Sequence, residues 1–105
     1  MENGFVEVAD GKKLLEGEGI VVTAGNREIA LFKTSDGRLF AVDNSCPHRG
    51  GPIAEGMLTG STVTCPWHGW PFDLATGACL YNDAACLESF EVCVEGGRIH
   101  VRMSR

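Results

Sequence analysis

Two short segments combine cysteine with histidine at close spacing. Cys46 and His48 flank one proline in the segment CPH, and Cys65 and His68 begin and end the segment CPWH. Sixteen residues separate the two pairs. Thiolates and imidazoles both bind transition metals, so these four side chains suit either a tetrahedral zinc site or an iron–sulfur cluster. The sequence therefore predicts a metal centre built from two loops.

The residues around these pairs favour open and sharply bent loops. Gly50 and Gly51 follow the first pair, and Gly69 follows the second. Glycine permits the backbone bends that converging ligands require, and the proline beside each cysteine lowers the entropy cost of an ordered loop. A small core gains little from so much irregular backbone, so we expect residues 43–77 to hold a bound group.

Short strands are predicted on both sides of this segment. Asp36-Gly37 lies between two apolar runs and predicts a hairpin, and Gly96-Gly97 predicts another near the C-terminus. In that last hairpin we expect Val92 and Val94 to face inward, with Cys93 and His100 on the wetter face. Residues 12–18 could hold one helical turn. The remaining strands are expected at residues 5–8, 20–23, 27–33, 39–42 and 61–64. An all-β chain is therefore predicted.

Size and charge limit the possible functions. The 105 residues suit a single domain, with 44% apolar residues and a net charge of −5. The acidic balance argues against nucleic acid and anionic membranes as partners. No signal peptide and no membrane span is predicted, and we expect a cytoplasmic protein. The five cysteines are an odd number, which fits metal binding better than a fully paired disulfide framework.

The sequence resembles the Rieske 2Fe–2S proteins of the soluble branch. The resemblance rests on the runs CPHRGGPIAEG and CPWHGWPFDLATG and extends from about Glu28 to the terminal hairpin. It implies an antiparallel β-sandwich, formed by residues 1–42 and 78–105, into which a small cluster-binding subdomain at residues 43–77 is inserted. It also implies that Cys46 and Cys65 bind one iron of a 2Fe–2S cluster, and that His48 and His68 bind the other.

The implied function is one-electron transfer within a larger oxidoreductase. Replacing two thiolates by neutral imidazoles leaves the oxidised cluster formally neutral, which makes electron uptake easier. Protonation of the outer imidazole nitrogens would couple the potential to pH. The chain lacks a phosphate-binding glycine motif, and His100 alone remains for any second iron site. We therefore expect an electron carrier or a non-catalytic subunit rather than a complete enzyme.

Departures from the respiratory branch of the family are informative. That branch has two additional cysteines that form a disulfide between the loops, where this sequence has Gly51 and Trp67. It also places serine and tyrosine hydroxyls near the cluster, where Trp70 and Phe72 stand here. Hydrogen bonds to sulfur stabilise the added electron, so their absence predicts a potential near the lower end of the Rieske range, roughly −150 mV.

Two redox systems are compatible with the resemblance. The downstream Cys86 and the run CPHRGGPIAEG favour the small subunit of assimilatory NAD(P)H nitrite reductase, whose large subunit contains sirohaem and flavin. The alternative is the ferredoxin of ring-hydroxylating dioxygenases, which a separate reductase reduces. A third hypothesis is a zinc-bound or metal-free interaction module that keeps the fold as a scaffold. The expected partner is accordingly a reductase, a large catalytic subunit, or both.

Several residues near the motifs have an ordinary structural explanation as well as a functional one. Trp67, Trp70 and the nearby prolines Pro52 and Pro71 could be core, or an apolar collar against which a redox partner docks. Arg49 would add a positive charge there. A disulfide between Cys79 and Cys86 is conceivable, although a cytoplasmic chain favours free thiols, and Cys93 is expected to be an ordinary free thiol.

Overall fold

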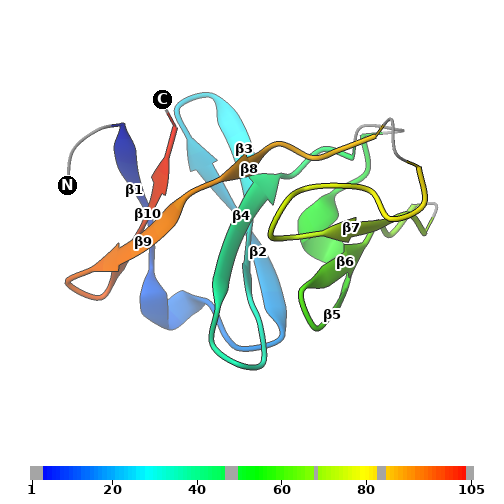
Figure 1. Cartoon of the computed structure of the whole chain (residues 1–105). Helices are drawn as coiled ribbons and strands as arrows, with labels where there is room; N and C mark the ends of the chain where they lie inside the picture. The colour runs from blue at the N-terminus through cyan, green and yellow to red at the C-terminus, as the bar shows by residue number, and fades with distance from the viewer. Residues whose placement is uncertain (1–3, 47–49, 68, 83–84, 104–105) are drawn as a thin grey trace.

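The computed structural model describes residues 4–46, 50–67, 69–82 and 85–103. Its strands form three antiparallel sheets, with orders β1-β10-β9, β2-β3-β4-β8 and β5-β6-β7 (Figure 1). No helix in the described part of the chain is long and apolar enough to cross a membrane. The strands are β1 (Phe5–Asp10), β2 (Glu18–Ala24), β3 (Arg27–Lys33), β4 (Leu39–Asp43), β5 (Met57–Thr59), β6 (Thr62–Thr64), β7 (Pro71–Asp73), β8 (Ser89–Phe90), β9 (Val92–Glu95) and β10 (Arg98–Arg102).

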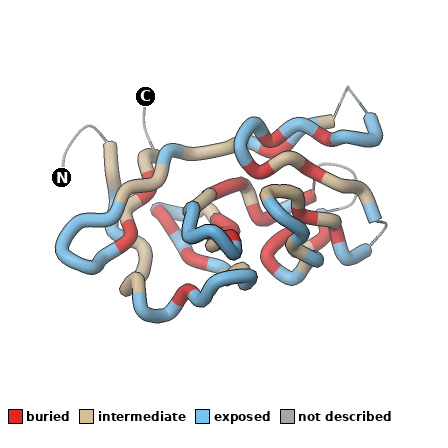
Figure 2. The backbone as a smooth tube through the Cα atoms, turned by 60° about the horizontal axis from the view of Figure 1, so that its bottom comes forward, coloured by how far each residue is buried: buried red, intermediate tan, exposed pale blue. Residues whose placement is uncertain are grey.

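The first two sheets pack face to face as the predicted β-sandwich. One core lies between them, and it takes Ile29 and Leu31 from β3 and Ile99 and Val101 from β10. The opposite face of β3 contributes Ala30 and Phe32 to a second core. Because β3 is buried on both faces, its sequence is a continuous apolar run rather than an alternating one. The buried backbone in Figure 2 follows these central strands.

Hairpins connect β2 to β3 and β3 to β4 in the second sheet. The β3–β4 turn contains Asp36 and Gly37 as predicted, and Gly37 has a φ of 86°, a value that glycine adopts without strain. Thr34 closes this turn, since its hydroxyl accepts a hydrogen bond of 3.1 Å from the Arg38 amide. The β2–β3 pairing runs without interruption from Glu18 opposite Lys33 to Ala24 opposite Arg27.

The C-terminal hairpin departs from the predicted alternation at its tip. β9 pairs with β10, and Val92 packs against the first core, but Val94 is 53% exposed. At this tip the Gly97 carbonyl accepts a hydrogen bond of 2.9 Å from the Gly11 amide. Cys93 and His100 are half-buried on the other face.

Four small elements differ from the sequence-based expectation, one near the N-terminus and three in the segment that carries the two motifs. The predicted helical turn is a 3-10 turn, η1 (Gly11–Lys13), which lies earlier than expected. A second 3-10 turn, η2 (Ile53–Glu55), and the strands β5 and β7 had no counterpart in the prediction. Each is three residues long, too short for hydrophobic periodicity to reveal. These last three lie in the segment that carries the two metal-binding motifs.

Candidate metal centre

The first loop leaves the end of β4 and returns to the sheet through η2. Its Cys46 is buried, and the Cys46 amide donates a hydrogen bond of 2.9 Å to the Gly51 carbonyl. Gly50 donates another, of 2.7 Å, to the Cys46 carbonyl, and its φ of 73° fits glycine. Ser45 pairs with Pro52 across the base of the loop. The backbone itself therefore fixes the position of the Cys46 thiol.

Asn44 anchors this loop, and the sequence analysis did not identify it. Its buried side-chain oxygen accepts a hydrogen bond of 2.8 Å from the Ala54 amide, and its carbonyl accepts one of 2.8 Å from Ile53. The side-chain amide also donates to Glu28, at 3.4 Å. A buried polar side chain is stable only when it is hydrogen-bonded. Its position in the sequence, between the end of β4 and Cys46, was the feature that could have indicated this anchoring role.

The second loop connects β6 to β7 and has the same design. The buried Cys65 donates a backbone hydrogen bond of 2.9 Å to the Trp70 carbonyl, and its own carbonyl accepts one of 3.0 Å from Gly69. Gly69 has a φ of 77°. These two backbone hydrogen bonds hold Cys65 at the start of the loop and leave Pro66 and Trp67 in the turn at its tip.

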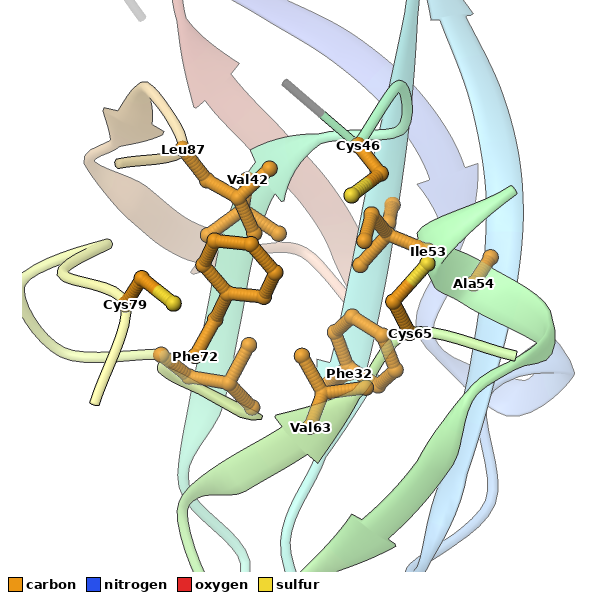
Figure 3. Packing of buried hydrophobic residues seen from close by; sticks show 12 residues of the cluster. Phe32, Val42, Cys46, Ile53, Ala54, Val63, Cys65, Phe72, Cys79 and Leu87 are labelled. Carbon is orange, nitrogen blue, oxygen red and sulfur yellow. The ribbon is translucent and has the colours of Figure 1, made fainter. Parts of the chain in front are cut away.

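The two loops meet at Gly51. A Cβ atom placed on Gly51 would lie 3.0 Å from the Cys65 sulfur and 3.0 Å from Cγ of Trp67. Only glycine leaves this space open, so the residue is selected by a close approach. Figure 3 shows Cys46 and Cys65 on either side of Ile53 in the second core. Two thiols from opposed loops, buried and brought together in this way, fit the soft-ligand half of a cluster site.

The other two predicted ligands, His48 and His68, lie outside the described residues, as do Pro47 and Arg49. Within the described ranges, no group of three or more His, Cys, Asp and Glu side chains is placed to hold a metal ion.

The residues around the loops divide into core and surface. Phe72 is fully buried between the loops and the sheet, and Trp70 is half-buried against the same core. Pro52 and Pro71 are also half-buried. Trp67 is 62% exposed, although its ring contacts the space beside Gly51. Trp67 thus lies on the surface, whereas Trp70 contributes mainly to packing.

An ion-pair triad fixes the entry to the first loop. The Arg27 guanidinium lies 2.8 Å from the Asp43 carboxylate and 2.9 Å from that of Glu88. The hydrogen bonds that the guanidinium donates to Glu88 and, to a lesser degree, to Asp43 raise the pKa of Arg27 above its already high value. This triad joins the end of β4 to the segment that follows the second loop.

No disulfide joins any of the five cysteines, all of which lie in the described ranges. Cys79 is buried and Cys86 is exposed, and the two are not joined. Cys79 pairs with Phe72, while Cys86 pairs with Ala78. Residues 77–82 and 85–87 thereby form a strap along β7, and Leu80 donates a hydrogen bond of 2.8 Å to the Pro71 carbonyl.

Residues 4–91 match the model of the Rieske [2Fe-2S] domain. The chain belongs to the Rieske family. It is an electron-transfer protein that carries a Rieske 2Fe–2S cluster, as predicted from the two motifs. The all-β fold and the family prediction are thereby confirmed, and the zinc-bound and metal-free hypotheses are set aside.

Full-length relatives of similar size are ferredoxins. The chain is 32% identical to the ferredoxin component of a Pseudomonas aeruginosa naphthalene 1,2-dioxygenase system, over 99% of this chain and 100% of that protein. It is 38% identical to the ferredoxin component of the Xanthobacter autotrophicus alkene monooxygenase system, over 90% and 78%. By contrast, it matches only 17% of the length of a Hemicentrotus pulcherrimus cholesterol 7-desaturase, at 37% identity.

Solved structures of both expected kinds share the fold. A Mycobacterium tuberculosis protein assigned as the small subunit of an NADH-dependent nitrite reductase superimposes with a TM-score of 0.89 at 25% identity, covering 96% of each chain. The ferredoxin of a Nocardioides aromaticivorans carbazole 1,9a-dioxygenase superimposes with a TM-score of 0.84 at 26% identity, covering 92% of this chain and 95% of that one.

Proposed function

We propose that Cys46 and Cys65 bind one iron of the cluster and that His48 and His68 bind the other. The close approach of the two cysteine loops carries this assignment. The buried Cys65 sulfur faces Gly51, and the Gly51 carbonyl accepts a hydrogen bond from the amide of the buried Cys46. The cluster supplies one-electron chemistry, and its imidazole-bound iron would lie at the loop tips. The cluster-binding unit would correspond to residues 43–77, inserted in the sandwich of residues 1–42 and 78–105.

The ligand assignment is tested by histidine substitution. Variants His48→Ala and His68→Ala should lose the cluster, or should lose one nitrogen coupling in the pulsed EPR spectrum of the reduced protein. His100→Ala is the matched control, because this histidine lies on β10 in the other part of the fold. A His48 variant that keeps the full iron content and both nitrogen couplings would refute the assignment.

The physiological role that we propose is the ferredoxin component of a multi-component oxygenase. The support is sequence identity to such ferredoxins, at 32% over the whole length of one and at 38% over 78% of the other. The partners would be a reductase that donates electrons and an oxygenase that accepts them, in the cytoplasm. Because a shuttle must exchange partners, it should bind each of them transiently.

The second candidate is the nitrite reductase small subunit that the sequence analysis favoured. Its support is the similarity to the M. tuberculosis structure, at a TM-score of 0.89. Purification of the tagged protein from its native extract distinguishes the two roles. A small subunit should bring with it a large protein that contains sirohaem and flavin, whereas a shuttle should elute without a stoichiometric partner.

A further inference from the structure

The end of the molecule that carries the two cysteine loops, called the cluster end below, has an unusual distribution of charge. Residues 43–88, which include both cysteine loops and the segment after them, contain five Asp and Glu residues and one Arg, Arg49, so their net charge is −4. The described cation that lines the same cavity as Ser45 and Gly50 is Arg27, and two carboxylates hold it, so that triad has one net negative charge. The other described cations belong to η1, β3, the β3–β4 turn and β10: Lys12, Lys13, Lys33, Arg38, Arg98 and Arg102.

An exposed apolar surface lies at the same end. Tyr81 is 75% exposed, and its ring centroid lies 6.0 Å from that of Trp70. Trp70 in turn accepts the backbone hydrogen bond of Cys65, so the contact reaches the second loop directly. Leu80 and Trp67 are each 62% exposed. The 80–82 turn lies at the same end of the fold as both cysteine loops, opposite β1 and β10 (Figure 1).

We propose that Trp67, Leu80 and Tyr81 form a docking surface for a redox protein whose own face has an apolar centre and a rim of Lys and Arg. The proposal rests on the electron-transfer function and adds the partner's chemistry. Exposed aromatic and aliphatic side chains supply the contact area, because such anchors dominate binding at interfaces. The net negative charge of residues 43–88 makes a basic partner complementary and an acidic one repulsive.

Charge complementarity also argues against a second copy of this chain as the occupant. Two copies joined through this surface would bring two acidic ends together, and like charges at an interface are costly. A basic partner, by contrast, is attracted by the acidic cluster end and repelled by the cations of β10. This uneven charge therefore orients the partner toward the cluster end as it approaches. Steering of this kind acts on the association rate and weakens as salt is added.

Stopped-flow electron transfer tests the proposal with two probes of opposite charge. The protein, reduced and freed of dithionite, is mixed with oxidised mitochondrial cytochrome c, a basic protein, or with oxidised plastocyanin, an acidic one. In each reaction one electron leaves the cluster and reduces one haem iron or one copper. We expect the second-order rate with cytochrome c to fall about tenfold or more from low to high salt. The rate with plastocyanin should be lower and should rise with salt.

Matched variants locate the surface. Leu80→Ala and Tyr81→Ala should each lower the low-salt rate with cytochrome c at least about threefold. Leu15→Ala is the control for Leu80→Ala. It removes the same type of side chain, with a similar exposure of 59%, at a position after η1, and should leave that rate unchanged. Glu88→Gln should lower the rate and flatten its salt dependence, whereas Glu95→Gln makes the same change of net charge at the β9–β10 turn and should have a smaller effect.

Three results would overturn the proposal. They are a rate with cytochrome c that does not depend on salt, equal effects of Leu80→Ala and Leu15→Ala, and a dimer that Tyr81→Ala converts to a monomer. The EPR spectrum of each reduced variant shows whether its cluster is intact. An unmodified protein without a cluster signal would count against the proposed function, whereas Leu80→Ala and Tyr81→Ala variants with an intact cluster and unchanged rates would count against the docking surface.

Discussion

At the scale of single residues, the environment of the two thiols determines how strongly the protein holds an added electron. Phe72 is fully buried beside them, and Trp70 is half-buried. Neither side chain offers a hydroxyl group to a sulfur atom. The surroundings of Cys46 and Cys65 thus provide backbone contacts and apolar packing, a combination that favours a low reduction potential for a Rieske centre.

Adding a hydroxyl at Phe72 should raise that potential. A hydrogen bond that stabilises the reduced form by about 1 kcal/mol corresponds to about 40 mV for one electron. Redox titration of Phe72→Tyr measures the change, and Trp70→Ser should act in the same direction. Phe40→Tyr is the control, since Phe40 packs on the same core from β4 and should leave the potential unchanged. An unchanged or lower potential for Phe72→Tyr, with the cluster intact, would contradict the hydroxyl argument.

The close approach of Cys65 and Trp67 to Gly51 leads to a second prediction. In Gly51→Ala, the new methyl group would lie 3.0 Å from the Cys65 sulfur and 3.0 Å from the Trp67 ring, so the two loops must separate. We expect a loss of more than half of the bound iron, measured as iron per chain. The double variant with Trp67→Ala should recover only part of that loss, because the contact with sulfur persists. Wild-type iron content in Gly51→Ala would show that the loops do not meet as described.

The residues of the site were predictable to different degrees. Two cysteines and two histidines at fixed spacing are a local pattern, so the sequence was sufficient to identify the family. The roles of Asn44 and Gly51 depend on residues that the fold brings together, such as Ala54 and Cys65, and no spacing rule contains those contacts. The exposure of Trp67 and the burial of Trp70 likewise follow from the closure of one loop, not from residue type.

At the scale of elements, the strap of residues 77–82 and 85–87 lies along β7 and includes the turn at residues 80–82. Gly77 donates a hydrogen bond of 2.6 Å to Asp73, and Leu87 donates one of 2.7 Å to Gly77. Gly77 has a φ of 81°, and a Cβ atom there would lie 2.0 Å from the Leu87 carbonyl oxygen. The two ends of the strap can therefore meet only at a glycine.

A pair of glycine variants separates steric contact from backbone strain. Gly17 has nearly the same φ, 83°, but no atom lies within 4 Å of its position for a Cβ. Gly17→Ala should therefore lower the free energy of unfolding by about 1 kcal/mol, from strain alone. Gly77→Ala should lower it by about 2 kcal/mol more, because backbone must move. Urea denaturation measures both, and equal losses would contradict the close contact at Gly77.

The predictability of the elements followed their length and their packing. β3 was predicted with its observed bounds, since seven consecutive residues of one sandwich strand leave a clear apolar run. The hairpin at Asp36-Gly37 was predicted because the turn chemistry is local. β5, β7 and η2 were missed because each holds three residues, and their conformation depends on pairing with β6 or on hydrogen bonds to Asn44.

At the scale of the whole molecule, the buried residues form two cores: one joins the sandwich sheets, and the other contains the proposed binding site. The first core joins the two sandwich sheets and contains neither thiol of the proposed site. The second contains both Cys46 and Cys65, together with Val63 of β6 and Phe72 of β7. β3 and β4 contribute residues to both cores, and β3 is buried on both faces. The bound cluster should consequently stabilise one part of the fold more than the other.

Removal of the cluster should therefore loosen the fold unevenly. In protein from which iron has been chelated, we expect amide hydrogen exchange to accelerate at least about tenfold in β5, β6 and β7. Exchange in β2, β3 and β10 should change much less, because the first core does not include the site. Equal acceleration in all strands would indicate a single cooperative unit and would contradict the division into two cores.

The central claim is that this chain holds a 2Fe–2S cluster through two cysteines and two histidines, and low-temperature EPR tests it most directly. The purified protein should be red-brown and should bleach with dithionite. It should then give a rhombic signal with an average g value below that of all-cysteine clusters. A colourless protein that is EPR-silent after anaerobic reconstitution and binds one zinc per chain would contradict the claim.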